Sequence, residues 1–507
     1  MRGTTLPDLL ASAVRGARDD AALTHREGSL TYGELALWVE RCAAVLAKSG
    51  IAPGERVALL ALNTPAALVW TFAVAHVGAV LVPLNWRLSP RELATVTEHA
   101  DIQLLLAEPE LLGLAQEATS RPVLEIASDG SAPGGAEAQP APLAVQVDEQ
   151  DAAHLYYTSG TTGDPKGVVL THRNVCTHAL FAVAELSLTR ADTWAHIAPM
   201  FHLADAWATL AITAVGGRHV FLERFEEGAA LDLFESERVT LTNLVPAMLN
   251  LMVEHAGADA SRFPDLRVVL SGGAPIAPRV VRRITERLGA PYLQTYGMTE
   301  TSPYLTLSRL SGAQERLPEE QRFALSARTG RPFMGVALEV VNEAGQPVAR
   351  DDVEVGEIRV SGPTVTPGYL DNPAATAAAL RDGWLYTGDL ATIDASGSVQ
   401  IVDRKKDMIL SGGECVYSTE VEAVLYEHPS VLEAAAYGEP DERWGERVCC
   451  AVRLRAGAEL DARALIEFCR ASLAGYKCPK EVRFVDQLPR TGSGKIAKRL
   501  LRGTGRA

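Results

Sequence analysis

The feature that most constrains the fold is the regular alternation of helix-like and strand-like segments over the first 110 residues. Thr31-Tyr-Gly-Glu34 has the pattern of a capping box and predicts an amphipathic helix that ends near Ser49-Gly50. The segments that follow are, in order, a strand at 56–61, a helix start at Thr64-Pro65, a strand at 80–83, a helix start at Ser89-Pro-Arg-Glu92 and a strand at 103–107. Strands separated by single helices at this spacing form right-handed βαβ units and a mostly parallel sheet.

Changes of periodicity further along the chain predict the domain organisation. The α/β alternation continues to about residue 310. Between 335 and 403, short runs of period two separated by turn signals predict a small antiparallel β unit. The remaining residues mix helices and strands. We therefore expect an α/β protein with a large N-terminal domain at 1–403, which includes the β unit, and a small mobile α+β domain at 404–507.

The balance of charges limits the kinds of partner. The chain has 48 Lys and Arg against 63 Asp and Glu, a formal net charge of −15, and its 47% hydrophobic residues are usual for a globular protein. A nucleic-acid-binding protein normally presents a basic face, so this balance argues against nucleic acid as a partner. It leaves room for small anionic ligands, because a few local cations and backbone donors suffice to hold them.

The cysteines and the apolar runs bear on localisation. The seven cysteines include no C-x-x-C pair, which argues against a zinc framework or a thioredoxin-like motif. The first residues, MRGTTLPDLL, lack the apolar core of a secretory signal. The apolar stretch 66–84 is interrupted by His76, Gly78 and Pro83, so we expect a helix followed by a strand and no integral membrane segment. A reduced, cytoplasmic protein is predicted.

The segment 157–172, YTSGTTGDPKGVVLTH, carries the strongest chemical signal in the chain. A strand-like approach leads into a loop rich in Ser, Thr and Gly, which is followed by Pro165, Lys166 and Gly167. Glycines let successive amides converge on an anion, hydroxyls add donors, and a lysine supplies a point charge. The Walker A pattern is absent, so the segment predicts a different kind of phosphate loop, with an ordinary glycine turn as the alternative.

Two more loops follow predicted strands, at 271–275 (SGGAP) and 296–300 (YGMTE). In open α/β sheets, ligands bind outside the carboxyl ends of the strands, which is where both loops fall. Tight strand–helix turns are the alternative interpretation of each. Glu300 is the acidic candidate for a magnesium ligand beside phosphates.

These motifs carry a resemblance to a known family. The phosphate loop, YGMTE (296–300), TGDL (387–390), DRKKD (403–407), SGGE (411–414) and PRTGSGK (489–495) occur in this order. Together they resemble the adenylate-forming superfamily of acyl- and aryl-CoA synthetases, non-ribosomal peptide synthetase adenylation domains and luciferases, and most closely its acyl-CoA synthetases. The resemblance implies that ATP activates a carboxylic acid as acyl-AMP with release of pyrophosphate, and that the acyl group then passes to coenzyme A. It also implies Mg²⁺.

The resemblance assigns residues to the adenylation half-reaction. The catalytic residues would be Lys166, Thr299, Glu300 and Lys495, with Glu300 as the metal ligand and Lys495 between the substrate carboxylate and the α-phosphate, where negative charge accumulates. The ATP-binding residues would be Thr158, Ser159, Gly160, Thr161, Thr162, Gly163, Gly272, Gly273, Ala274, Tyr296, Gly297, Asp389 and Arg404.

It also assigns residues to substrate binding and thioester formation. The acyl pocket would be lined by His202, Asp205, Trp207, Met248, Met298 and Tyr304. The CoA and thiolation site would include Gly412, Gly413, Glu414, Trp444, Tyr476 and Lys477. The small domain would turn about a hinge at Lys406, which exchanges the catalytic lysine for the Gly412-Gly413-Glu414 loop.

Two departures from the family pattern leave alternatives open. The loop after Glu414 lacks the usual Asn and Pro and has Cys415 instead, which makes the details of the thiolation loop less secure. Asp205 stands where relatives usually have a small residue, and either faces the acyl pocket or caps the next helix. Large apolar side chains at the predicted pocket favour a sizeable apolar acid, aliphatic, alicyclic or aryl, of fatty-acid or secondary metabolism. A stand-alone enzyme that loads a carrier protein in trans is the alternative function, and a homodimer is left open.

Overall fold

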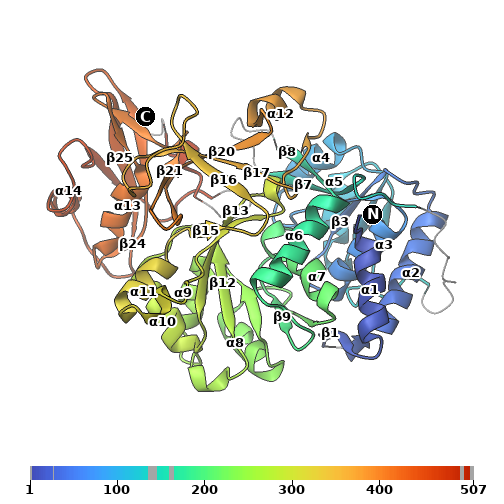
Figure 1. Cartoon of the computed structure of the whole chain (residues 1–507). Helices are drawn as coiled ribbons and strands as arrows, with labels where there is room; N and C mark the ends of the chain where they lie inside the picture. The colour runs from blue at the N-terminus through green and yellow to red at the C-terminus, as the bar shows by residue number, and fades with distance from the viewer. Residues whose placement is uncertain (1–2, 27, 135–145, 159–164, 491–495, 503–507) are drawn as a thin grey trace. The chain divides into compact units, whose positions relative to one another are not determined.

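The computed structural model describes residues 3–26, 28–134, 146–158, 165–490 and 496–502. The chain divides into two compact units, the first formed by Met1–Ala337 with Val360–Leu385 and the second by Leu338–Arg359 with Tyr386–Ala507. Figure 1 labels their helices and strands. None of the helices in the described part combines the length and the apolar character that a membrane span requires.

The first unit contains a nine-stranded sheet that is parallel in its centre. The pairs from β1 through β10, β9, β11 and β12 to β13 are parallel, and only the outer strands β2, β14 and β15 pair antiparallel. The strands are, in spatial order, β15 (Arg331–Pro332), β14 (Tyr304–Leu307), β13 (Tyr292–Gly297), β12 (Val268–Gly272), β11 (Leu241–Asn243), β9 (Thr193–His196), β10 (Arg218–Phe221), β1 (Ala21–His25) and β2 (Gly28–Thr31).

A second, seven-stranded sheet in this unit carries the strands on both sides of the phosphate loop. Strands β3, β4, β5, β6 and β7 pair in parallel, whereas β8 pairs antiparallel with β7 and with β18. The strands are, in spatial order, β18 (Gly368–Tyr369), β8 (Lys166–Thr171), β7 (Ala152–Thr158), β4 (Val80–Pro83), β3 (Arg56–Leu60), β5 (Leu104–Ala107) and β6 (Val123–Glu125).

Alternate side chains of the strands enter different hydrophobic clusters, and this alternation sets the helices in layers. Leu59 and Leu270 belong to a cluster that both sheets share with α1, α2, α3, α6 and α7. Leu60 points instead toward α4 and α5, and Val269 toward α8, α9 and α10. The helices of this unit are α1 (Leu6–Ala17), α2 (Tyr32–Lys48), α3 (Pro65–His76), α4 (Pro90–His99), α5 (Leu112–Ala118), α6 (His172–Glu185), α7 (Leu203–Val215), α8 (Glu227–Ser236), α9 (Pro246–Glu254), α10 (Pro278–Leu288), α11 (Glu319–Ser326) and α12 (Pro373–Ala379).

Local sequence signals account for the element boundaries near the N-terminus. The Thr31 hydroxyl accepts from the Glu34 amide at 3.3 Å, and the Glu34 carboxylate accepts from the Thr31 amide at 2.8 Å, so the predicted capping box starts α2. Ser89 and Glu92 start α4 in the same way. The strand predicted at 80–83 is β4. The predicted α/β alternation of this region is confirmed.

The second unit contains most of one small sheet and all of another. The first sheet comprises β16 (Ala337–Val341), β17 (Gly356–Ser361), β20 (Trp384–Ile393), β19 (Leu380–Arg381) and β21 (Val399–Arg404), and β20 pairs antiparallel with β19 and β21. The second comprises β23 (Glu414–Val416), β22 (Ile409–Ser411), β25 (Gly445–Leu454), β24 (Val431–Asp441) and β26 (Glu481–Phe484). Helices α13 (Ser418–Glu427) and α14 (Ala462–Arg470) pack on a cluster that includes Ile409 and Leu465.

The predicted fold class, parallel α/β layers with smaller antiparallel sheets, is therefore confirmed. The division by contacts places most of the 335–403 segment in the same compact unit as the C-terminal residues, whereas the sequence grouped it with the N-terminal domain. The domain boundary, the hinge near Lys406 and the mobility of the C-terminal domain stay predictions.

Candidate active site

The phosphate loop is framed by two antiparallel strands. Thr158 at the end of β7 pairs with Lys166 at the start of β8, which turns the chain back on itself. Lys166 is half-buried and forms no ion pair within the described residues, so its charge is available to a ligand. The predicted phosphate-binding residues between the strands lie outside the described residues, and these are Ser159, Gly160, Thr161, Thr162 and Gly163.

Lys166 and Glu300 both contact one aromatic side chain, Tyr369, the first over its ring and the second at its hydroxyl. The Tyr369 hydroxyl donates to Glu300 Oε1 at 2.9 Å, and Lys166 Nζ lies 5.3 Å from the centroid of the Tyr369 ring. Glu300 is 7% exposed and follows Thr299 in a short 3₁₀ helix (Thr299–Thr301). Burial, with a smaller contribution from Glu300, raises the pKa of Tyr369, which therefore remains a neutral donor.

Tyr369 was not among the residues selected from the sequence. It follows Gly368 in a two-residue strand, 69 residues from Glu300 in the chain, and no short motif signals that contact. Only the pairing of β18 with β8 brings it to the site.

The loops expected to frame a nucleotide lie at the carboxyl ends of neighbouring parallel strands. Gly272 at the end of β12 pairs with Thr295 of β13, next to Tyr296. A Cβ on Gly272 would lie 2.3 Å from Thr295 Oγ1, so only glycine allows the two strand ends to approach this closely. Gly273 has φ +84°, a left-handed conformation that favours glycine, and with Ala274 it is exposed. The structure therefore brings these residues and Gly297 to one edge of the nine-stranded sheet.

Asp389 and Arg404 form a pair within the second unit. They are opposite each other in the β20–β21 register, and Arg404 Nε lies 3.1 Å from Asp389 Oδ1. The Asp389 side chain is 7% exposed and that of Arg404 is 50% exposed. A buried carboxylate with an exposed cation beside it has the chemistry for binding a sugar hydroxyl. Lys406, two residues after Arg404, is exposed, and its carbonyl accepts from the Arg502 guanidinium at 3.3 Å. Lys495 lies outside the described residues.

The residues assigned to thioester formation lie at turns next to β22, β23 and β25 of the other small sheet and in the segment between α14 and β26. The Gly412 amide donates to the Trp444 carbonyl at 2.7 Å, and a Cβ on Gly412 would lie 2.9 Å from the Trp444 ring. Gly413 and Glu414 continue this exposed turn. Lys477, beside the exposed Tyr476, is held by Glu420 through bonds of 2.7 and 2.8 Å.

Asp205 neither caps a helix nor faces an open pocket. The N-cap of α7 is His202, and no side chain caps it. The Asp205 side chain is 0% exposed and accepts from His196 Nδ1 at 2.5 Å and from Trp194 Nε1 at 3.3 Å. His196 Nε2 in turn lies 3.0 Å from His219 Nδ1. The carboxyl group therefore belongs to a buried polar network beneath α7, in which it is hydrogen-bonded to residues of β9, of which His196 is bonded in turn to His219 of β10.

The other residues predicted for the acyl pocket are only partly brought together. Trp207 and Tyr304 are buried and their rings lie 5.2 Å apart, in one aromatic cluster with His178. Met248 packs in the separate hydrophobic cluster of α8, α9 and α10. Met298 and His202 are half-buried in the loops that precede the 3₁₀ helix Thr299–Thr301 and α7.

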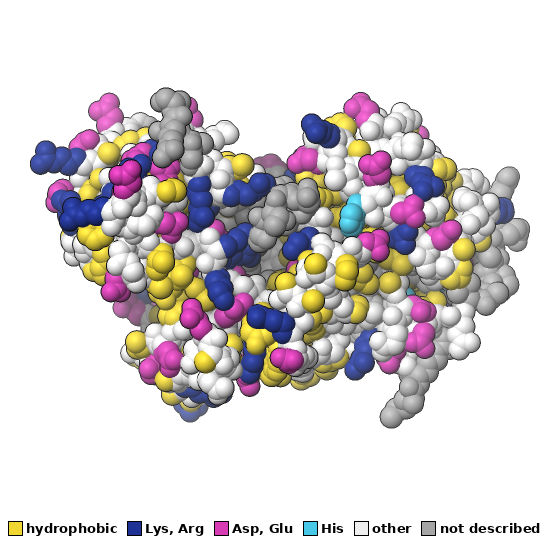
Figure 2. All heavy atoms as spheres, turned by 90° about the horizontal axis from the view of Figure 1, so that it is seen from above, with side chains coloured by type: hydrophobic (Ala, Val, Ile, Leu, Met, Phe, Trp, Pro, Cys, Tyr) yellow, Lys and Arg dark blue, Asp and Glu magenta, His cyan; other side chains and the backbone are white. Residues whose placement is uncertain are grey.

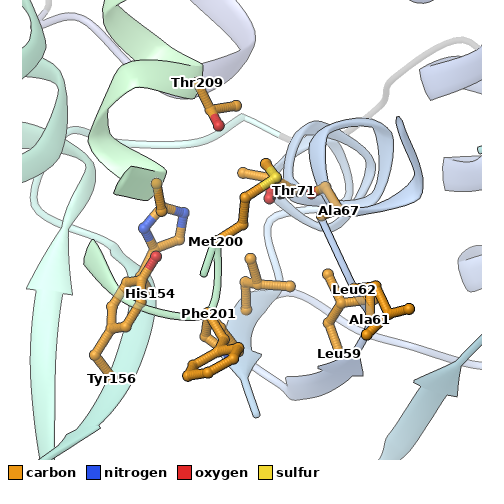
Figure 3. A pocket seen from close by; sticks show the side chains of 13 residues that line it. Leu59, Ala61, Leu62, Ala67, Thr71, His154, Tyr156, Met200, Phe201 and Thr209 are labelled. Carbon is orange, nitrogen blue, oxygen red and sulfur yellow. Dashed lines mark hydrogen bonds between the residues drawn. The ribbon is translucent and has the colours of Figure 1, made fainter. Parts of the chain in front are cut away.

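A small cavity in the first unit is lined by other residues, among them Phe201 and Ala206, which are neighbours of His202 and Asp205 in the chain. It is ≈ 20 Å³, enough for a water molecule, and Figure 3 shows His154 and Tyr156 on one side of it with Leu59, Ala61 and Leu62 on the other. Neither ring nitrogen of His154 has a hydrogen-bond partner among the described residues. Burial lowers the pKa of His154 to about 3, so the imidazole is neutral. The cavity suits an ordered water bonded to His154.

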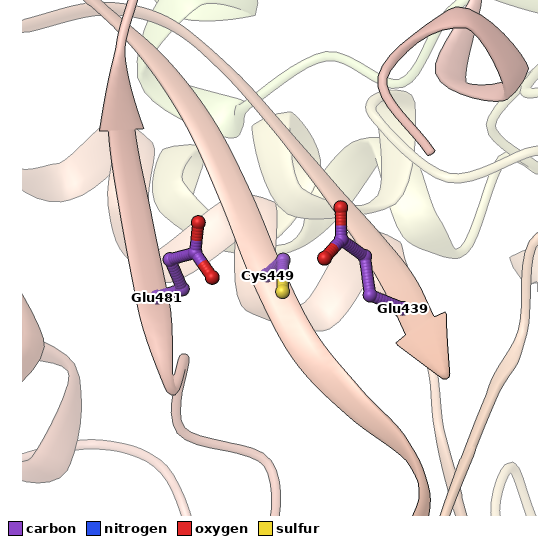
Figure 4. A group of neighbouring side chains, drawn as sticks. All are labelled: Glu439, Cys449 and Glu481. Carbon is purple, nitrogen blue, oxygen red and sulfur yellow. The ribbon is translucent and has the colours of Figure 1, made fainter. Parts of the chain in front are cut away.

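One group of side chains in the second unit has the composition of a metal site, and its surroundings argue against that role. Glu439, Cys449 and Glu481 offer ligand atoms within 4.8 Å of one another (Figure 4). Both carboxylates are already bonded to Arg447, at 3.1 and 2.9 Å, and to Arg483, at 3.0 and 2.6 Å. Burial raises the pKa of Cys449 to about 11, so the sulfur stays a thiol and a poor ligand.

A cluster of two arginines and two aromatic rings after β4 was not predicted from the sequence. The guanidinium carbons of Arg87 and Arg224 lie 4.9 and 4.6 Å from the Trp86 ring centroid, and Phe201 meets the ring edge-on at 6.1 Å. Arg224 pairs with Glu110, whereas Arg87 forms no ion pair within the described residues. Partial desolvation and the nearby Arg224 lower the pKa of Arg87. The position beyond the carboxyl end of a parallel strand was the signal that could have found it.

Charged side chains of both signs reach the face drawn in Figure 2. Lys and Arg side chains there are interspersed with Asp, Glu and apolar side chains on each unit.

Comparison with known proteins places this arrangement in a family. The family described as AMP-binding enzyme matches residues 10–370, and the AMP-binding enzyme C-terminal domain matches 420–495. A feruloyl-CoA synthase of Amycolatopsis sp. is 39% identical, with 94% of each chain covered. A long-chain-fatty-acid–CoA ligase of Thermus thermophilus is 37% identical, with 93% of this chain and 89% of the relative covered.

Solved structures of related enzymes match this chain over nearly its full length. ATP-bound MatB from Rhodopseudomonas palustris has a TM-score of 0.89 at 31% identity, with 99% of each chain covered. The o-succinylbenzoate CoA synthetase MenE from Bacillus subtilis, solved with its acyl-adenylate intermediate, has a TM-score of 0.88 at 29% identity, with 98% of each covered. The chain therefore belongs to the AMP-binding enzyme family, near its acyl- and aryl-CoA synthetases.

Proposed function

We propose that the protein is an ATP-dependent acid–CoA ligase that activates a hydrophobic carboxylic acid as acyl-AMP and transfers the acyl group to coenzyme A. The observation that carries the proposal is the convergence of Lys166 and the buried Glu300 on Tyr369, beside the frame of the phosphate loop. A cation without an ion pair among the described residues and a buried carboxylate, both beside Tyr369, are what a nucleotide triphosphate and its metal require.

In the first half-reaction, a carboxylate oxygen of the acid attacks the α-phosphorus of ATP, and the bond to the bridging oxygen of pyrophosphate breaks. Lys166 and the loop at 159–163 would hold the leaving phosphates, and Lys495 would stabilise the charge that develops at the α-phosphate. Gly272, Tyr296 and their neighbours would frame the adenine, and Asp389 with Arg404 the ribose.

Glu300 is the residue that fits a magnesium ion. Its carboxylate is buried, accepts on one oxygen from a neutral phenol, and is preceded in the chain by Thr299, which is half-buried. Mg²⁺ in nucleotide sites is usually held by one or two carboxylates together with substrate phosphates, so a dedicated cage is not needed. When bound, the ion would neutralise phosphate charge, while Glu300 and Thr299 keep it in place.

In the second half-reaction, the thiol sulfur of CoA attacks the acyl carbonyl carbon, AMP leaves as the anion, and the thiol proton passes to solvent. The Gly412–Gly413–Glu414 turn and Trp444 would flank the thiol, after a rotation at Lys406 removes Lys495. Arg87, which forms no ion pair among the described residues, lies beside Trp86 and supports a contact with the phosphates or adenine of CoA, because arginine and an indole face suit a nucleotide.

The acid is proposed to be aryl or aliphatic. The aromatic cluster of Trp207 and Tyr304 supports an apolar group, as do relatives named for ferulate and for long-chain fatty acids. A carrier-protein thiol is the alternative acceptor, and assembly as a homodimer is part of the proposal to be measured. The free thiols of all seven cysteines support a cytoplasmic enzyme.

The test is acid-dependent exchange of labelled pyrophosphate into ATP, with and without Mg²⁺, over a panel of cinnamic, benzoic and fatty acids. Each active acid is then incubated with CoA and the thioester is measured by chromatography. We expect exchange that needs both acid and Mg²⁺, and thioester formation with the same acids. A folded protein without exchange on any acid would overturn the proposal. Exchange without thioester would shift the acceptor to a carrier protein.

A further inference from the structure

We propose that Tyr369 is a positioning residue that orients the Glu300 carboxylate toward the metal and keeps the Lys166 ammonium apart from it. This inference rests on the proposed function and deepens it. Tyr369 would act through its two neighbours, since its hydroxyl is already engaged by Glu300. Removing the hydroxyl should therefore weaken metal binding more than nucleotide binding.

The hydrogen bond between Tyr369 and Glu300 has a defined direction. A carboxylate can only accept, so the phenol donates, and the 2.9 Å distance is that of a normal bond. Glu300 is 7% exposed, so water does not readily replace this donor. The carboxylate is thereby fixed on one oxygen and cannot rotate freely about its last bond.

The backbone around Tyr369 is bonded on both sides, which makes the side chain a rigid support. The Tyr369 amide donates to Thr376 Oγ1 at 3.0 Å, and the Leu370 amide donates to the Gly167 carbonyl at 2.8 Å. The Thr366 amide donates to the Glu300 carbonyl at 2.8 Å. The loop that carries Glu300 and the strand that begins with Lys166 are therefore both tied to the segment that carries Tyr369.

The ring of Tyr369 explains how opposite charges stay available at one site. Lys166 forms no ion pair within the described residues, and its Nζ lies 5.3 Å from the ring centroid, within the range of a cation–π contact. Such a contact is weak enough for a phosphate to replace. Without the ring, the ammonium would be drawn to the buried carboxylate, and the pair would compete with both the metal and the phosphates.

The test compares Tyr369→Phe, which keeps the ring, with Tyr369→Leu, which removes it, in the full-length protein. Tyr426→Phe is the matched control, because its hydroxyl donates to the Ala434 carbonyl at 3.4 Å within the second compact unit. Binding of Mn²⁺ to the complex with a non-hydrolysable ATP analogue is followed by electron paramagnetic resonance. Binding of the analogue without metal is followed by calorimetry.

For Tyr369→Phe we expect Mn²⁺ affinity to fall about 10-fold or more, the usual effect of removing a partner that orients a metal ligand, with metal-free analogue affinity unchanged. Tyr369→Leu should also weaken the metal-free analogue, by about two- to fivefold, because Lys166 loses its ring. Mn²⁺ affinity within twofold of wild type in Tyr369→Phe would overturn the inference, as would equal weakening of both ligands. Since wild-type exchange tests the ligase function separately, the two failures are distinguishable.

Discussion

Replacing Asp205 with alanine should destabilise the first unit rather than retune its substrate pocket. Both oxygens of the carboxyl group are bonded, to Trp194 Nε1 at 3.3 Å and to His196 Nδ1 at 2.5 Å, and the side chain is 0% exposed. Alanine would leave two buried donors without a partner, at about 1–3 kcal/mol each. For the two donors together we therefore expect a loss of about 2–6 kcal/mol.

The network beyond Asp205 makes the prediction sharper. Burial, with a smaller effect of His196, holds the pKa of His219 well below its ordinary value of 6.5, so His219 is a neutral ring with one donor and one acceptor. With a carboxylate at one end, protons run from Thr213 through His219 and His196 to Asp205, over links of 3.1, 3.0 and 2.5 Å. In Asp205→Asn, the side-chain amide would donate to His196 Nδ1. His196 would then donate to His219, and His219 to Thr213, so each hydrogen bond of the chain is kept with its direction reversed.

Asp205→Asn should therefore cost only about 0.5–1.5 kcal/mol, the net value of an ordinary hydrogen bond. Urea unfolding followed by tryptophan fluorescence is the assay, since the Trp194 and Trp207 rings lie 5.1 Å apart in the affected cluster. Asp232→Ala is the control, because its side chain is 76% exposed and its pair with Arg262 should contribute less than about 1 kcal/mol. Equal losses for Asp205→Asn and Asp205→Ala, or no loss beyond the control, would refute the reasoning.

Three further predictions concern catalysis, pH and acceptor binding. Lys495→Ala should slow pyrophosphate exchange by about 10²–10³ and spare thioester formation from supplied acyl-AMP, whereas Lys406→Pro should do the reverse; equal loss of both half-reactions in both variants would contradict alternation. The pKa of His154 is lowered to about 3, so its contribution to stability is present above pH 6.5 and is lost on acidification. His154→Leu should accordingly reduce the loss of unfolding free energy between pH 6 and 5 by about 1.4 kcal/mol in urea titrations, and an unchanged slope would contradict this. Arg87→Gln should raise the KM for CoA about 10-fold and leave the KM for ATP unchanged. An equal rise in both KM values would contradict a role of Arg87 in CoA binding.

The local structure was largely determined by the sequence. The capping box of Thr31 and Glu34 and the buried run 80–83 appear at the predicted positions, because helix starts and strand runs depend on groups within a few residues of one another. The loops at 271–275 and 296–300 were likewise placed at strand ends by the order of elements alone. Ordered motifs were sufficient to identify the family before any contact was known.

The contacts between distant segments were decided only by the tertiary structure. Tyr369 and Glu300 are 69 residues apart, and nothing near either of them in the chain indicates the bond between their side chains. The local pattern predicted that Asp205 faces the acyl pocket or caps a helix. In the structure, its carboxyl group is instead buried and hydrogen-bonded to His196 and Trp194 of the neighbouring strand β9. Side-chain partners of this kind depend on strand order and packing, which bring together groups that share no local backbone geometry.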